Sequence, residues 1–218
     1  MSALKELDWQ APQGRVFGFP TKDPPIMCQT ILQNPSFFKF LLRIDQDHAA
    51  TIRLRGCIHC GGPLHQTHYE RKPRDAPSSW IEEKIRFSFC CGHCRRRCTP
   101  ASVRFLGRRV YWGATVLLVT ALCHGLPLRR SNKLSQHFGV PIQTLRRWRQ
   151  WWLTEFILTP VWQTLRGRFL PPVEAHSLPG ELLHRCSART ATKSTLLQDS
   201  MTQVMRWLAP LSTLTEDQ

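Results

Sequence analysis

Two Cys-x-x-Cys pairs constrain the fold of this chain more than any other feature of its sequence. The first is "CIHC", with Cys57 and Cys60, and the second is "CGHC", with Cys91 and Cys94. At this spacing a tight turn can point two thiolates at one tetrahedral Zn²⁺ ion. Two such pairs predict a single structural zinc site with four cysteine ligands. Such a site is closed by its protein ligands and therefore has no catalytic role.

The composition around the pairs is typical of a small domain held together by a metal. Residues 51–106 are rich in Cys, His, Gly and Pro, which favours loops and short strands over packed helices. Gly61 and Gly92 lie in the two turns, where glycine supplies backbone freedom. We therefore predict a zinc ribbon. We also expect metal binding to contribute to folding, because this segment has little core of its own.

The ligand assignment in the second pair leaves alternatives open. Cys90 and Cys98 compete with Cys91 and Cys94, although the Cys-x-x-Cys spacing favours the latter two. Cys90 would point away from the site in an extended strand, because side chains alternate along a strand. Four histidines are further possible substitutes: His59, His65, His68 and His93.

The number of cysteines and the first residues indicate a reducing compartment. The chain has nine cysteines, and its start, "MSALKELDWQ", lacks the basic residues and apolar core of a secretory signal. An odd number of thiols then indicates metal ligands or buried thiols instead of a disulfide framework. We therefore expect a cytoplasmic protein.

The positive charge of the chain is concentrated in one segment. The net charge is +15, and residues 84–154 contain 14 Lys and Arg residues but no Asp or Glu. A surface that binds polyphosphate excludes carboxylates, because each would repel the phosphate backbone. The pattern predicts a nucleic-acid partner, with an anionic membrane or an acidic protein as alternatives. Phosphate contacts are expected directly after the second cysteine pair, from Arg95, Arg96 and Arg97.

An uncharged run at Val110–Leu128 approaches the length of a membrane span. Polar and helix-breaking residues within the run, and arginine pairs at both of its ends, favour a buried helix instead. We expect this helix to support the segment that follows, with no part of the chain in a membrane. The flanking arginines, which would then lie near a DNA backbone, are Arg108, Arg109, Arg129 and Arg130.

The segment 130–152, "RSNKLSQHFGVPIQTLRRWRQWW", has the pattern of two helices joined by a short turn. Gly139 can adopt the left-handed conformation that ends the first helix, and Val140 fills the turn. Pro141 can begin the second helix, where its missing N–H costs nothing. We predict a helix-turn-helix with a long recognition helix from Ile142 to Trp152.

The predicted recognition helix has one apolar side and one polar side. At about 100° per residue, Leu145, Trp148, Trp152 and Phe156 fall together, so this side should pack against the protein. The other side presents Gln and Arg, which can pair with adenine and guanine in the major groove. The expected DNA contacts of this helix are Gln143, Thr144, Arg146, Arg147 and Gln150, with Arg149 at a phosphate.

These patterns divide the chain into four parts. Residues 1–50 form an N-terminal helical and irregular segment, and residues 51–106 form the zinc ribbon. Residues 107–170 form the helix-turn-helix, and residues 171–218 form a linker and an amphipathic helix. That last helix should dock on the protein's own core or on a partner. The expected fold class is mainly α with a small zinc-ribbon β element, and with the helix-turn-helix C-terminal to the ribbon.

The order of these motifs resembles the N-terminal DNA-binding module of bacterial insertion-sequence transposases. The resemblance rests on the paired knuckles, "TPASVRFLGRRVYWG", an apolar helix and "LSQHFGVPIQTLRRW", and covers about Cys57 to Trp152. It implies zinc ligation by the four cysteines of the two pairs and DNA recognition by the helix Ile142–Trp152. The spacer of 30 residues between the pairs and the doubled Cys90–Cys91 depart from the usual ribbon.

Transposases of this kind continue with a ribonuclease-H-like domain, whose three carboxylates hold two metal ions for strand cleavage. The 66 residues after Trp152 are too few for that fold, so we expect no enzyme activity. The resemblance then implies a zinc-dependent double-stranded DNA-binding protein at the nucleoid, which assists transposition or regulates a mobile element. A transposase or recombinase is the expected partner, and a homodimer the expected oligomer. Alternatives are a general transcription regulator, an RNA-binding zinc-ribbon protein, and a metal-dependent nuclease that would use Glu155.

Overall fold

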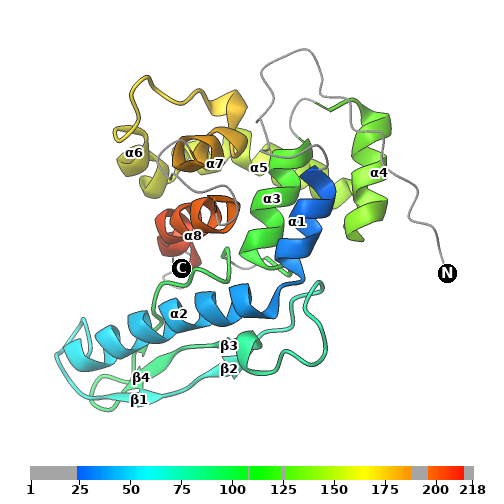
Figure 1. The fold of residues 1–218 in the computed structure, drawn as a ribbon. Helices are drawn as coiled ribbons and strands as arrows, with labels where there is room; N and C mark the ends of the chain where they lie inside the picture. The colour runs from blue at the N-terminus through cyan, green and yellow to red at the C-terminus, as the bar shows by residue number, and fades with distance from the viewer. Residues whose placement is uncertain (1–23, 108, 124–125, 188–195, 214–218) are drawn as a thin grey trace. The chain divides into compact units, whose positions relative to one another are not determined.

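The structure is a computed structural model that describes residues 24–107, 109–123, 126–187 and 196–213 (Figure 1). The chain is mainly helical and contains two small antiparallel sheets, which confirms the coarse fold class expected from the sequence. It divides into two compact units, each built from segments that are far apart in the sequence. We call residues 34–116 with 201–218 the ribbon unit, and residues 1–33 with 117–200 the helical unit.

The ribbon unit begins with helix α2, Pro35–Arg55, which lies in the segment expected to be helical and irregular and extends five residues beyond it. The side chain of Asn34 caps its start by accepting a hydrogen bond from the Ser36 N–H at 2.9 Å. Gly56 ends the helix with a φ of 79°, and a Cβ there would lie 2.9 Å from the carbonyl oxygen of Gly61. Only glycine therefore fits where the chain leaves α2 for the first cysteine pair.

Two small sheets follow α2 in the ribbon unit. The three-stranded sheet has the order β1–β4–β5, and β2 pairs with β3 in the second sheet. Ala49 of α2 packs with the sheet residues Leu64 and Phe89 in one buried cluster. The sequence-based segment boundary between residues 50 and 51 thus falls within a helix that packs on the ribbon. The strands are β1 Leu64–Gln66, β2 Tyr69–Glu70, β3 Ile85–Arg86, β4 Phe89–Cys91 and β5 Arg97–Cys98, with a 3₁₀ turn at Glu82–Lys84.

A buried ion pair joins α2 to the segment after β5. Arg104 Nε donates to Asp45 Oδ2 at 2.7 Å, and neither side chain is more than 1% exposed. The Val103 N–H donates to the other Asp45 oxygen at 2.7 Å, so both carboxylate oxygens have partners. Arg86 is also buried. Two arginines of the basic segment therefore lie inside the protein and contribute nothing to its surface charge.

In its described residues, the helical unit contains α-helices and short 3₁₀ turns. The division between the units falls within two helices, since α3 enters the helical unit at Leu117 and α8 leaves it after Ser200. The helices are α1 Pro24–Leu32, α3 Gly113–Cys123, α4 Leu128–Phe138, α5 Ile142–Thr154, α6 Pro160–Arg166, α7 Gly180–Ser187 and α8 Leu196–Leu208. Short 3₁₀ turns lie at Phe156–Leu158, Ala175–Ser177 and Ala209–Ser212.

The uncharged run contains α3, which has 11 residues and is buried. No described helix has the length and hydropathy to cross a membrane. The apolar side of α8 is at most 5% exposed at each of its residues, which are Leu197, Met201, Val204, Met205 and Leu208. This side of α8 therefore packs in the protein's own core.

Candidate metal centre and candidate nucleic-acid interface

The two Cys-x-x-Cys pairs come together in the ribbon unit. The Sγ atoms of Cys57, Cys60, Cys91 and Cys94 all lie within 4.8 Å of one another. The Sγ distances are 3.5 Å for Cys57 to Cys94 and 3.5 Å for Cys60 to Cys91. A tetrahedral ion with metal–sulfur bonds of about 2.3 Å would hold its thiolates about 3.8 Å apart. The four residues can therefore hold one metal ion.

The two pairs lie on turns with nearly the same backbone. Gly61 N–H donates to the Cys57 carbonyl at 2.8 Å, and Arg95 N–H donates to the Cys91 carbonyl at 3.2 Å. In both turns the residue after the second cysteine has a positive φ, 69° at Gly61 and 60° at Arg95. The role expected for Gly61 is confirmed. In the second turn the left-handed residue is an arginine, so the backbone there is strained.

Gly92 has another role than the one expected from the sequence. It is not among the residues with positive φ, so the turn needs no special backbone freedom there. Instead, a Cβ at Gly92 would lie 2.7 Å from Nε2 of His65. Similarly, a Cβ at Gly62 would lie 2.7 Å from Nδ1 of His93. Both glycines provide space for histidine rings beside the cysteines.

The surroundings of the thiols favour ionised sulfur at some positions and oppose it at others. The N–H of His59 lowers the pKa of Cys57 to about 6, and the N–H of Cys94 lowers the pKa of Cys91. The N–H of Arg96 lowers the pKa of Cys94, but burial and the neighbouring thiols together raise that pKa to about 12. Four crowded thiols cannot all ionise because of their mutual repulsion, which a bound cation would remove.

The alternative ligands lie outside the four-cysteine group. Cys98 is buried on β5 opposite Phe89, and the Cys90 Sγ donates to the Arg95 carbonyl at 3.4 Å. The Nδ1 of His68 lies 2.9 Å from the carbonyl oxygen of Ser88. Among the described residues, none of the alternative cysteines and histidines belongs to a group that could hold a metal.

The three arginines after the second pair are exposed. Arg96 Nη1 lies 3.2 Å from Nδ1 of His59 in the first turn, and the Arg97 guanidinium lies 5.9 Å from the centre of the Tyr69 ring. Arg95 projects from its strained position in the second turn. The ribbon unit therefore displays a cationic surface directly beside its candidate metal site.

Helices α4 and α5 of the helical unit are joined at Gly139, Val140 and Pro141. Gly139 has a φ of 62° and ends α4 in the left-handed conformation, as expected from the sequence. Val140 is fully buried, and the Pro141 carbonyl accepts the hydrogen bond of the Leu145 N–H at 3.1 Å. The expectations for Gly139 and Val140 are confirmed, whereas Pro141 is the N-cap residue that precedes α5, which begins at Ile142.

Helix α5 has the two sides expected from the sequence. Leu145, Trp148, Trp152 and Phe156 are at most 5% exposed, and the Trp152 and Phe156 ring centres are 4.7 Å apart. The opposite side has four exposed candidates for base contact, which are Gln143, Arg146, Arg147 and Gln150.

Thr144 differs from the other candidate DNA contacts on α5. Its side chain is buried, with 8% exposed, and its Oγ1 accepts a hydrogen bond from Arg147 Nη2 at 3.3 Å. A buried hydroxyl cannot reach a base edge. Thr144 therefore positions Arg147 in this structure and presents no polar group to a groove.

The flanking arginines have different environments. Arg129 is exposed at the start of α4, and Arg130 beside it is half-buried. Arg109 is half-buried and donates from Nη1 to the Leu106 carbonyl at 3.3 Å. Arg108 lies outside the described residues. The candidate nucleic-acid contacts are thus divided between the ribbon unit and the helical unit.

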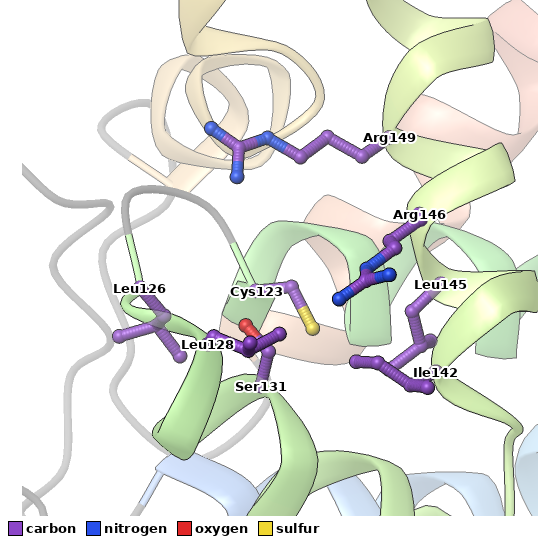
Figure 2. Close-up of a pocket in the computed structure, with 8 residues that line it drawn as sticks. All are labelled: Cys123, Leu126, Leu128, Ser131, Ile142, Leu145, Arg146 and Arg149. Carbon is purple, nitrogen blue, oxygen red and sulfur yellow. The ribbon is translucent and has the colours of Figure 1, made fainter.

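A cavity in the helical unit was not expected from the sequence. It has a volume of about 210 Å³ and lies between the end of α3, the start of α4 and helix α5 (Figure 2). Arg146 and Arg149 both line it. The sequence could show that these two arginines are neighbours on one helix, because they are three residues apart. It could not show the cavity, which depends on how α4 packs against α5.

Comparisons with known proteins identify no relative of this chain: no family model, curated protein or solved structure matches it. The resemblance to insertion-sequence transposases thus remains one of motif order.

Proposed function

We propose that this chain is a zinc-dependent double-stranded DNA-binding protein of a mobile element, which assists transposition or regulates the element. The single observation that carries the proposal is the exposed Gln and Arg side of α5, on a helix whose opposite side is buried. Gln143, Arg147 and Gln150 are the residue types that pair with adenine and guanine in the major groove. In this proposal α4 and α5 act as a helix-turn-helix, with α5 as the recognition helix.

Zinc is the metal proposed for the four-cysteine site. Four thiolates in a tetrahedral arrangement favour zinc or iron–sulfur chemistry over hard ions such as magnesium. The set is complete with protein ligands alone, as in structural sites, so the ion would stabilise the fold and take no part in a reaction. It would also hold Arg95 and Arg96 in place for phosphate contacts.

The distribution of charge supports a polyanionic partner. The sequence from residue 84 to 154 has no carboxylate side chain, and this segment includes both α4 and α5. Arg129 at the start of α4 and Arg147 on α5 are exposed. Phosphate contacts of such residues would fix the register of the helix, while the side chains on α5 would read the bases.

The association with a mobile element rests on the order of the cysteine pairs, the apolar helix and the two helices that follow it. A nucleoid location, a transposase or recombinase partner and a homodimer belong to the same proposal. A dimer is expected because one helix-turn-helix reads few bases. No catalytic role is assigned to the chain.

The deciding experiment is selection of bound duplexes from a random DNA pool by the zinc-loaded protein at near-physiological salt. We expect enrichment of a defined motif, and a motif that matches the ends of a mobile element would support the role in transposition. A motif found in ordinary promoters would favour a general transcription regulator. Binding without any enrichment would contradict the proposal that α5 reads sequence.

Two added assays test for RNA binding and for nuclease activity. Structured RNA should compete for the protein less well than the selected duplex, and stronger competition by RNA would favour an RNA-binding protein. The selected duplex should also remain intact with Mg²⁺ or Mn²⁺. Cleavage that is lost in the Glu155→Ala variant would contradict the absence of catalysis.

A further inference from the structure

The cavity between α3, α4 and α5 combines an apolar lining with two cationic groups (Figure 2). Leu126 and Leu145 are buried in its wall, whereas Leu128 at its rim is 56% exposed. At about 210 Å³ it is larger than the cavity of about 150 Å³ that is known to bind benzene. The space therefore admits an organic group the size of a benzene ring. The complete lining is Cys123, Leu126, Leu128, Ser131, Ile142, Leu145, Arg146 and Arg149.

The two arginines give the cavity its chemical selectivity. In Figure 2 the Arg146 guanidinium points toward Cys123, and the Arg149 side chain extends along the upper side of the same group of residues in this view. Within the described ranges, neither guanidinium forms an ion pair with a carboxylate. Two such cations beside one cavity favour an anion, and a carboxylate can accept hydrogen bonds from both.

The remaining polar lining does not oppose an anion. Burial raises the pKa of the Cys123 thiol to about 12, although the charge of Arg149 lowers it. The thiol is therefore neutral at physiological pH and contributes no negative charge. The charged side chains among the lining residues are Arg146 and Arg149.

We propose that this cavity binds a small organic carboxylate whose apolar body is about the size of a benzene ring. The carboxylate contacts Arg146 and Arg149, and the apolar body lies against Leu128 and Ile142. Because Arg146 is also a candidate base contact, the bound anion competes with DNA. This second step rests on the proposed function, whereas the binding of the anion does not.

Benzoate is the probe for the first step. Isothermal titration calorimetry of the full-length, zinc-loaded protein without DNA should detect benzoate binding at matched ionic strength. Benzyl alcohol has the same ring without the charge, and acetate has the charge without the ring, so both should bind at least about tenfold more weakly. No benzoate binding, or equal binding of acetate, would overturn the proposal.

Three matched variants locate the site. Arg146→Gln and Arg149→Gln should each weaken benzoate binding by about tenfold, which is the usual effect of losing one charged hydrogen bond. Arg147→Gln makes the same change of charge at the residue after Arg146, which is outside the cavity lining, and should leave the affinity for benzoate unchanged. An equal loss in all three variants would mean that benzoate responds to charge alone and would reject the cavity as its site.

Competition with DNA is measured separately. Saturating benzoate should weaken binding of the selected duplex to the wild-type protein by at least fivefold, and should have a smaller effect on Arg149→Gln. Benzoate binding with unchanged duplex affinity would reject the competition. If no duplex is selected at all, the proposed function fails, while the calorimetric result for the cavity stands by itself.

Discussion

The ribbon unit and the helical unit hold their candidate functional groups in place by different means. In the ribbon unit the strands have two or three residues each, and the turns that carry the cysteines depend on polar contacts and on the candidate metal site. The buried pair of Asp45 and Arg104 adds a charged contact to this unit. In the helical unit α5 is held by apolar packing of Trp148, Trp152 and Phe156. The ribbon unit therefore adds candidate metal ligands and a buried charge pair to its apolar cluster, whereas α5 in the helical unit is held by buried apolar side chains.

The arginines of the basic segment include both exposed and buried side chains, and Arg95, Arg96 and Arg97 of the ribbon unit are exposed. In the ribbon unit, Arg86 and Arg104 are buried, and Arg104 is neutralised by a carboxylate from α2. In the helical unit, Arg146, Arg147 and Arg149 are exposed on one helix. Both sets belong to a single basic segment of the sequence. Net charge alone therefore overstates the cationic surface that a nucleic acid could contact.

The largest expected effect is that of removing the metal site. On the proposal that the four cysteines hold one zinc ion, Cys57→Ser should reduce the bound zinc from one ion per chain to none, because a structural site needs all four ligands. The free energy of unfolding should fall by about 4 kcal/mol or more, since loss of a metal is among the most destabilising changes. Metal analysis of the purified variant and urea unfolding measure the two quantities.

Two comparisons sharpen this prediction. Cys98→Ser alters a buried thiol outside the four-cysteine group and should keep one zinc per chain. In the wild-type protein, chelation of zinc should speed hydrogen exchange of the amides at residues 56–98, while those of α5 remain protected. Equal loss of zinc in both variants would refute the ligand assignment. Equal loss of protection in both regions would show that α5 also depends on the metal.

The buried ion pair gives the next effect. Asp45→Ala should destabilise the protein by about 3–5 kcal/mol, because it leaves the Arg104 charge buried and unpaired. Replacing both residues by apolar ones, as in Asp45→Leu with Arg104→Met, should recover at least half of the loss. Urea unfolding compares the three proteins. A double variant no more stable than Asp45→Ala would mean that the carboxylate acts mainly through the bonds it accepts from the Val103 N–H and the Ser102 hydroxyl.

Trp152 tests the apolar packing of the helical unit. The side chain is fully buried, and its indole N–H has no partner among the described residues, so its contribution comes from packing. Trp152→Ala should cost about 3–5 kcal/mol, and Trp152→Phe clearly less, as measured by urea unfolding. Zinc content should stay at one ion per chain in both variants. Loss of zinc in Trp152→Ala would show that the metal site of the ribbon unit also depends on the apolar packing of α5.

Local patterns in the sequence predicted much of this structure. The spacing of the cysteines predicted the four residues that come together as one possible metal site. The 3.6-residue period predicted which side of α5 is buried and which is exposed. The left-handed turn at Gly139 follows from residue type. The turn at Gly139 and the two sides of α5 depend on residues close together in the chain. The cysteine pairs are 31 residues apart, and the identical spacing within each pair is what linked them.

Features that depend on distant residues were not predicted. The pair of Asp45 with Arg104 joins positions 59 residues apart, and the unit boundaries join segments separated by more than 80 residues. The cavity likewise depends on the packing of three helices. Thr144 illustrates a smaller error of the same kind, because its position next to the polar side gave no sign that tertiary packing buries it.

A smaller effect separates the two candidate nucleic-acid surfaces. Arg147→Ala should reduce discrimination between the selected duplex and a random one by about 1–3 kcal/mol, the usual value of a base contact. Arg96→Ala should weaken both duplexes equally and reduce the slope of log affinity against log salt by about 0.9. Fluorescence anisotropy at several salt concentrations measures both effects. Uniform weakening by both variants would contradict the assignment of α5 as the reading helix.

The smallest effect concerns the two cysteine turns themselves. Arg95→Gly removes left-handed strain of about 1–2 kcal/mol but adds freedom to the unfolded chain, so the net gain in stability should be about 0.5–1 kcal/mol. Gly61→Arg makes the reverse change at the equivalent position, where an added Cβ meets no atom within 4 Å, and should lose a similar amount. If Arg95 binds phosphate, Arg95→Gly should become more stable yet weaken duplex binding severalfold. Weaker binding without a gain in stability would show that the turn tolerates arginine without strain.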